Sequence, residues 1–109
     1  ASDAAKGCAA RLAGIDVPAM PDEEKTFAEL QQRLAKTITF LKSVKREQMD
    51  GAEERTIIIK TPSRDFEMSG RDFVTGFAMP NFLFHVTTAY AILRHKGIAI
   101  GKMDYLGGV

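Results

Sequence analysis

The most regular apolar pattern along the chain begins just after Thr26. Thr26 and Glu29 have the spacing of a capping box, in which each side chain accepts a hydrogen bond from the other residue's backbone amide. Apolar residues then recur at three- and four-residue steps: Phe27, Leu30, Leu34, Ile38, Leu41 and Val44. This spacing predicts an amphipathic helix, with polar residues such as Arg33 and Lys42 on its solvated face. Residues 45–50 are expected to add one short helical turn before Gly51.

A second helical pattern runs from about Asp72 to Lys96, and it is apolar around most of its circumference. One stripe and much of the remaining surface are apolar: Phe82, Val86, Ala89 and Leu93, then Leu83, Phe84, Ala91 and Ile92. A helix of this kind is expected to be buried. Ser69 or Gly70 would cap it, and Pro80 should kink it because proline removes an interior hydrogen bond.

The remaining segments predict one more helix and a hairpin. Small apolar residues at helical spacing indicate a helix over about Ser2 to Ala13, which Gly14 would end. Residues 56–60 are rich in β-branched side chains and residues 66–68 alternate, which together predict a small β-hairpin. Residues 98–109 are expected to form an ordered tail over the helices.

These elements predict one all-α domain with a small β-hairpin, spanning residues 1–109. Three helices leave the most apolar one without enough cover, so a fourth helix is expected. It would come from a missing N-terminal segment or from a second copy of the chain. A missing N-terminal segment would also explain why the sequence begins with Ala1 and not with an initiator methionine, and why a helical pattern follows almost at once. A signal-cleaved start would lack the methionine as well.

Composition and charge narrow the class of protein. The chain carries 15 Lys and Arg against 14 Asp and Glu, mixed along its length, which disfavours nucleic acid as a partner. Its single cysteine, Cys8, cannot form an internal disulfide and is expected to be a small core residue. With no leader and no long apolar span in view, we expect a cytoplasmic protein without membrane contact.

His85 is the strongest candidate for a functional side chain. It lies in the most apolar helix, with Asn81 and Thr88 on its own side, and neutral imidazole is a common metal ligand. Asp3 would reach it if the first helix packs against the last, although a solvated or capping aspartate is the simpler interpretation. Tyr90 could line a pocket. The simpler interpretation is a core or boundary histidine that makes one hydrogen bond.

The other histidine does not complete a metal site. His95 follows ten positions later, which on an ideal helix places it roughly 80° around and about 15 Å along the axis. We therefore interpret His95 as a favourable positive charge near the C-terminus of the helix.

Several segments resemble a known family. They lie in all parts of the chain: Lys6-Gly7, Ala10 to Gly14, Thr26 to Leu30, Asp50 to Arg55, Pro80 to Phe82 and His85 to His95. Together they resemble the bacterial family named domain of unknown function nineteen ninety-three (DUF1993), which is similar in fold to the DinB/YfiT-like bundles of metal-dependent enzymes. The resemblance covers nearly the whole chain. It implies a four-helix bundle, here lacking its first helix.

The resemblance also implies where a metal would bind. DinB-like proteins typically hold a divalent metal with three histidines, two of them four residues apart on a late helix. Four residues after His85 the sequence has Ala89, and Ala4 or Ala5 stands where an early-helix histidine is expected. The resemblance thus predicts a degenerate metal site.

Two functions from different classes fit these observations. The first is a binding or structural module of unknown ligand. The second is a metal-dependent hydrolase or transferase, in which His85 and further ligands hold zinc or nickel. In either case the uncovered apolar surface predicts a homodimer.

Overall fold

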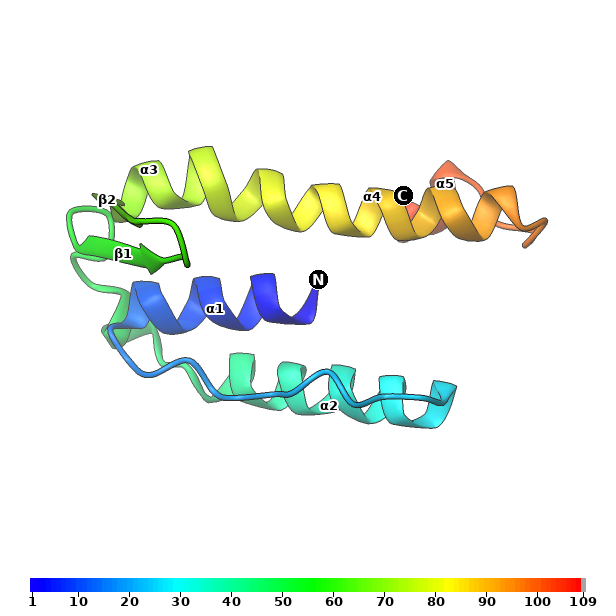
Figure 1. The fold of residues 1–109 in the computed structure, drawn as a ribbon, viewed down its shortest axis with the longest axis horizontal. Coiled ribbons are helices and arrows are strands. Elements are labelled where there is room, and N and C mark those ends of the chain that lie inside the picture. The colour runs from blue at the N-terminus through cyan, green and yellow to red at the C-terminus, as the bar shows by residue number, and fades with distance from the viewer. Residues whose placement is uncertain (109) are drawn as a thin grey trace.

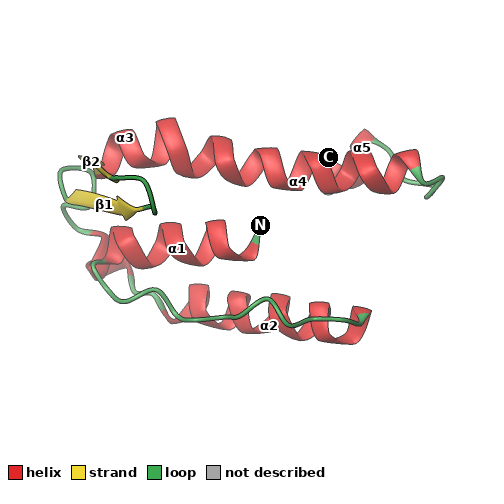
Figure 2. Cartoon of the chain, viewed as in Figure 1, coloured by secondary structure: helices red, strands yellow, loops and turns green. Residues whose placement is uncertain are grey.

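The computed structural model describes residues 1–108. Its elements, in chain order, are α1 (Ser2–Ala13), α2 (Phe27–Ser43), the 3₁₀ helix η1 (Arg46–Met49), β1 (Thr56–Lys60), β2 (Asp65–Ser69), α3 (Gly70–Asp72), the π-helix η2 (Phe73–Ala78), α4 (Met79–His95) and α5 (Lys102–Tyr105). α1 lies between α2 and the continuous helix made by α3, η2 and α4, with the hairpin at one end (Figure 1). The chain between α1 and α2 runs back along α2 as an extended strap (Figure 2). We call residues 14–26 the strap.

The first two helices begin and end as their sequences predict. Gly14 ends α1 in a left-handed conformation with φ of 69°, which glycine adopts without a steric penalty. At the start of α2 the Glu29 amide donates to Thr26 Oγ1 over 3.2 Å, and the Thr26 amide donates to Glu29 Oε2 over 2.8 Å. This is the predicted capping box, and the predicted turn within residues 45–50 is η1.

The hairpin contributes one face to a small core. β1 and β2 pair antiparallel from Thr56 opposite Ser69 to Lys60 opposite Asp65. Ile57 and Ile59 are buried, whereas Ile58 between them is 49% exposed, as alternation along a strand requires. The two buried isoleucines pack with Phe73 and Ala78. The predicted hairpin is therefore confirmed, and these two residues attach it to the long helix.

Cys8 and Leu12 extend this core from α1. The Cys8 thiol is half-buried, and burial raises its pKa although the nearby Arg11 guanidinium opposes that effect. A thiol held neutral in this way behaves as a small apolar side chain, as the sequence predicted.

The long helix differs from its prediction near Pro80. Ser69 caps it as expected, since its Oγ accepts from the Asp72 amide over 3.1 Å. A π-helical segment of six residues, which the sequence did not predict, directly precedes the proline. The Met79 amide bonds the carbonyl of Val74, five residues earlier. Proline has no N–H to donate, and in a regular α-helix its ring would clash with the carbonyl four residues earlier. The wider π-turn directly before Pro80 alters the positions of the carbonyls near the ring.

The prediction that this helix is buried all round is wrong for residues 1–108. No residue of α4 is buried, and Phe84 and Ile92 are 65% and 56% exposed. The reason is geometric, because α1 and the hairpin cover only the part of the helix that contains α3, η2 and the first turns of α4 (Figure 1). The apolar pattern of the sequence shows that these side chains favour burial, but it does not show which element would cover them.

α2 departs from its prediction at several residues, although Lys42 is exposed as expected. Its apolar stripe is open, with Phe27 88% and Ile38 50% exposed. Its Arg33 side chain, predicted to be solvated, is only 10% exposed, and Thr37 is buried. The strap and α1 cover these two residues, since Arg33 binds the Met20 carbonyl and Asp3, and the Thr37 hydroxyl contacts Met20.

The tail is ordered, as predicted, and includes the short helix α5, which the sequence pattern did not predict. The Tyr105 ring packs edge-on against Tyr90 with centroids 6.0 Å apart. Its hydroxyl lies 3.3 Å from Thr87 Oγ1. Val109, the last residue of the predicted tail, lies outside the described residues. None of the helices in residues 1–108 combines the length and apolarity required to cross a membrane.

Candidate functional site

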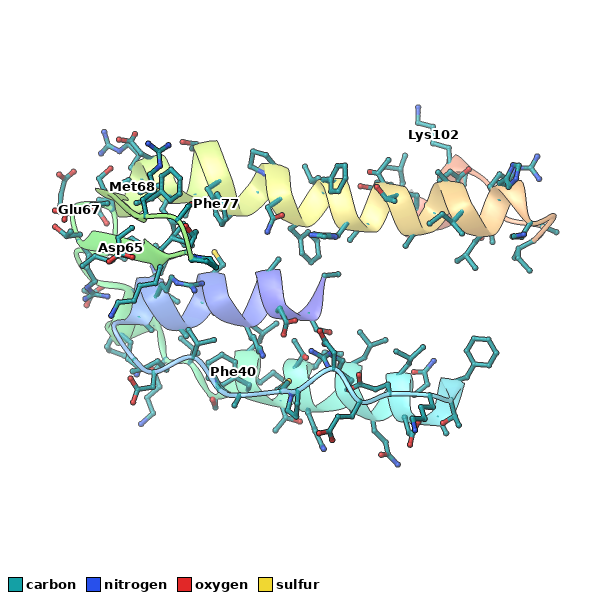
Figure 3. All side chains as sticks on the ribbon, viewed as in Figure 1. Phe40, Asp65, Glu67, Met68, Phe77 and Lys102 are labelled. Atoms are coloured by element: carbon teal, nitrogen blue, oxygen red, sulfur yellow. The ribbon has the colours of Figure 1, made fainter. Side chains whose placement is uncertain are left out.

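A pocket of about 200 Å³ lies between α1 and the long helix. Its lining comes from α1, β1, η2 and α4: Asp3, Ala4, Arg11, Ile59, Phe73, Phe77, Ala78 and Asn81. Ile59, Phe73 and Ala78 belong to the buried core and give the pocket an apolar floor. Phe77 extends from η2 on the side nearer the hairpin and α1 (Figure 3). The pocket therefore combines apolar walls with three polar side chains.

Arg11 reaches the pocket by folding back along α1. Its Nη1 atom lies 2.6 Å from the position that a Cβ atom on Gly7 would occupy. Side chains of a helix lean toward its N-terminus, and Gly7, one turn earlier, leaves the space that the guanidinium fills. In residues 1–108 no carboxylate lies within ion-pair distance of Arg11, and no hydrogen bond holds its guanidinium. The pocket thus contains a partly buried guanidinium without an internal partner.

Asp3 lies in the same pocket but is already paired. Its Oδ1 atom is 2.8 Å from Lys6 Nζ and 3.0 Å from Arg33 Nη2. The hydrogen bond from Lys6, with a smaller contribution from Arg33, holds the pKa of the Asp3 carboxyl below its ordinary value. The sequence suggested a contact between Asp3 and His85, whereas in the structure Asp3 pairs with these two cations.

A larger pocket, of about 400 Å³, lies between the strap and α2. Its arginine, Arg33, is fully engaged by Asp3, Asp22 and Glu24 and by the carbonyls of Met20 and Pro21. The hydrogen bond from Arg33 lowers the pKa of Glu24, and the bond to Glu24 raises the pKa of Arg33. Because these charges are paired with one another, we interpret this pocket as part of the contact that holds the strap against α2.

His85 is exposed and packs edge-on against Phe84, with ring centroids 5.4 Å apart. Across residues 1–108 no three His, Cys, Asp or Glu side chains are close enough together to hold a metal ion. A metal in a helical bundle needs three or more such ligands that project into one space. The donors of the described residues therefore do not fit the metal site that the DinB-like resemblance implies.

The other predicted site residues divide into two groups. Asn81 is half-buried and lines the pocket together with Asp3, so the structure brings these two together. Thr88 is exposed, and Tyr90 packs against Tyr105 of the tail. Neither Thr88 nor Tyr90 lines the pocket of Asp3 and Asn81.

Arg11 and the two phenylalanines of η2 were not among the sequence predictions. A signal for Arg11 was present, because Gly7 stands four residues earlier on the small-residue face of the same helix. A glycine at that spacing allows a long side chain to lie against the backbone. The π-helix gave no comparable signal, since its residues follow an ordinary helical pattern.

Comparisons with known proteins agree with this fold. The family model described as Domain of unknown function (DUF1993) matches residues 1–106. A crystal structure of a DinB family member protein from Shewanella denitrificans matches 99% of this chain at 41% identity with a TM-score of 0.87. The chain spans 61% of that protein's length. No curated protein matches the sequence significantly. The mainly helical fold is therefore DinB-like, and the chain belongs to the DUF1993 family.

Proposed function

We propose that this domain is a binding module that holds a small molecule in the pocket between α1 and the η2–α4 helix. The observation that carries this proposal is the convergence of Arg11, Asp3 and Asn81 above the apolar floor formed by Ile59 and Phe73. A concave apolar pocket with a few polar groups is the usual form of a small-molecule site. The ligand would be bound without a metal ion.

The arrangement at His85 supports a module without metal chemistry. Its ring contacts Phe84, and Ala89 occupies the position one turn later. Neither neighbour offers an electron pair to a cation. We propose that the metal site of the DinB-like fold is degenerate in this chain.

The second candidate is a metal-dependent hydrolase or transferase that uses His85. It is favoured by the similarity to a DinB family member, since His85 lies one turn from Asn81 of the pocket. Zinc or nickel would then require ligands from a partner chain or from residues beyond 1–108.

Elemental analysis separates the two candidates. The purified chain and a His85→Ala variant are compared for zinc and nickel content by plasma mass spectrometry, after dialysis without chelator. We expect the same content in both proteins, well below one metal ion per chain. A content near one ion per chain that is lost in His85→Ala would establish the metal-dependent candidate instead.

We further propose that the chain pairs with a second copy of itself. The apolar stripes of α2 and α4 are open over many residues: Phe27, Leu30, Leu34, Ile38, Leu83, Phe84, Ile92 and Leu93 are each at least 44% exposed. Extended apolar surfaces of this kind mark interaction sites in folded proteins. A two-fold pair would cover the same surface on both copies.

A further inference from the structure

We propose that the pocket selects a small planar carboxylate, which Arg11 and Asn81 would bind at its polar edge. This inference rests on the binding function proposed above and adds the chemical class of the ligand. It follows from the charge balance of the pocket, from its shape and from the way in which Arg11 is positioned.

The charge balance favours an anion. Arg11 is partly buried, and in the part of the chain that the structure describes it has no carboxylate partner. A guanidinium removed from water is stabilised by an anion, and its planar fork matches the two oxygens of a carboxylate. The Asn81 side chain adds a neutral amide that can donate a further hydrogen bond.

Asp3 is the one acidic residue in the lining, and its charge is already balanced. Lys6 at 2.8 Å and Arg33 at 3.0 Å both contact its Oδ1 atom. The side chain of Lys6 is only 6% exposed, so this pair is partly screened from solvent. Repulsion between Asp3 and a bound carboxylate is therefore reduced, while the charge of Arg11 remains available.

The shape of the pocket favours a small planar group. Its volume of about 200 Å³ is below the range of roughly 300–1,000 Å³ that is typical of drug-sized ligands. Phe73 and Phe77 stack with centroids 5.9 Å apart and planes 20° apart, and both line the pocket with Ile59. Aromatic walls of this kind pack well against a flat ring.

Gly7 is a positioning residue for the guanidinium. A Cβ atom at Gly7 would lie 2.6 Å from Arg11 Nη1, and within residues 1–108 the Arg11 side chain is all that it would approach within 4 Å, so alanine would displace only the flexible end of Arg11. Alanine is also the better helix former, so the helix itself would be retained. Gly7→Ala thus changes the position of the charge while it leaves the charge in the molecule.

The test is a titration of the 109-residue chain with benzoate, followed in proton–nitrogen correlation spectra. Benzamide, which has nearly the same shape but no charge, is the matched ligand. Arg11→Gln removes the charge, Arg11→Lys keeps the charge without the planar fork, and Gly7→Ala displaces the guanidinium. Arg46→Gln is the control, because Arg46 is an exposed arginine of η1 outside the pocket.

We expect benzoate to shift the Asn81 side-chain amide and the amides of η2 with a saturable curve. Arg11→Gln should weaken benzoate binding by about tenfold or more, as the loss of a charged hydrogen-bonding partner requires. Arg11→Lys and Gly7→Ala should give intermediate affinities, and Arg46→Gln should bind as the wild type does. Benzamide should bind the wild type more weakly than benzoate, and its affinity should not change in Arg11→Gln.

Three results would overturn the inference. If benzoate and benzamide bind this pocket equally, the proposed binding function stands and the selection of a carboxylate is wrong. If benzoate shifts no pocket signal, or if Arg11→Gln, Arg11→Lys and Gly7→Ala all bind it as tightly as the wild type, Arg11 does not form an anion site. The metal analysis of His85→Ala is independent of all these measurements, so failure of the two proposals can be told apart.

Discussion

Gly70 is the residue at which the fold tolerates no side chain. A Cβ atom there would lie 1.8 Å from the backbone oxygen of Ala52. The Gly70 amide also donates to the carbonyl of Arg55 over 2.8 Å, which fixes the start of the long helix beside the loop before β1. Because both neighbours are backbone atoms, the contact cannot be relieved by a change of rotamer.

We predict that Gly70→Ala lowers the free energy of unfolding by about 2 kcal/mol or more, in the upper part of the range for overpacking. Gly76→Ala is the matched control, because a Cβ atom at Gly76 meets nothing within 4 Å. Urea unfolding followed by circular dichroism measures both. Equal stability of the two variants would contradict the close approach of Gly70 and Ala52.

Phe73 is the only large side chain in residues 1–108 that is fully buried, at 1% exposure. We predict that Phe73→Ala costs about 3–5 kcal/mol, the usual cost of removing a buried phenylalanine. Phe84→Ala, at a residue that is 65% exposed, should cost much less in the monomer. Urea unfolding at low protein concentration tests this, and similar losses in the two variants would mean that the core lies elsewhere.

For single residues, the sequence predicted contacts between near neighbours in the chain better than contacts between distant residues. The Thr26 and Glu29 cap and the Gly14 stop depend on residues within one turn of each other, and both are confirmed. Arg33 was wrongly placed on a solvated face, because its partners Asp3 and Glu24 are brought to it by the path of the strap. Asp3 was expected to reach His85 if the first and last helices pack together, and it pairs with Lys6 and Arg33 instead.

Among the elements, the strap shows how a segment without secondary structure is held in place. Arg33 of α2 binds Asp22 and Glu24 and two strap carbonyls, and it binds Asp3 of α1 as well. One side chain therefore joins three elements. The Glu24 carboxylate, with a side chain 20% exposed, is the least solvated acid that it binds.

These contacts predict a dependence of stability on pH. In the folded chain the pKa of Asp3 is lowered mainly by Lys6, and that of Glu24 mainly by Arg33. Both pKa values lie below the ordinary value of about 4 for these carboxyl groups. As the medium becomes acidic, the unfolded chain therefore binds more protons than the folded chain does. The stabilisation is present near neutral pH, and it is lost as the pH falls through about 4 toward the folded values.

Arg33→Met should reduce this dependence, since it removes the main cause of the Glu24 shift and one cause of the Asp3 shift. The measurement is urea unfolding of wild type and variant at a series of pH values from about 6 down to about 3, across the range in which carboxyl groups titrate. We expect a shallower loss of stability in the variant. Parallel curves would show that Arg33 does not cause the pH dependence of stability.

The boundaries of helices and strands were predicted correctly where capping residues or a clear apolar pattern mark them in the sequence. The Ser2–Ala13 helix, β1 and the start and end of α2 agree with the patterns of apolar and capping residues. The π-turn of η2 and the short helix α5 were missed for different reasons. The π-turn differs from an α-helix by one hydrogen-bond step, and α5 is only four residues long.

For the whole molecule, the proposed pairing of two copies depends on the open apolar stripes of α2 and α4. The sequence predicted that the long helix needs cover on several sides, whereas only its first part is covered in residues 1–108. Helical periodicity indicates which side chains require a neighbour, but it does not specify the chain that supplies it.

We predict that the 109-residue chain is a homodimer in solution at micromolar concentration. A Phe84→Glu, Ile92→Glu double variant should shift it to the monomer, because both side chains are exposed on α4 and a charge there opposes apolar contact. Thr88→Glu, at an exposed polar position of the same helix, is the control. Light scattering coupled to gel filtration gives the mass, and a monomeric wild-type chain would contradict the proposed pairing.

The central claim is that a small carboxylate binds beside Arg11, and its location can be measured directly. Isotope-filtered nuclear Overhauser effects between benzoate and the labelled chain report protons within about 5 Å of the ring. We predict contacts to the methyl groups of Ile59 and to the rings of Phe73 and Phe77, which line the pocket. Contacts confined to the open stripes of α2 and α4, such as Leu34 and Phe84, would contradict it.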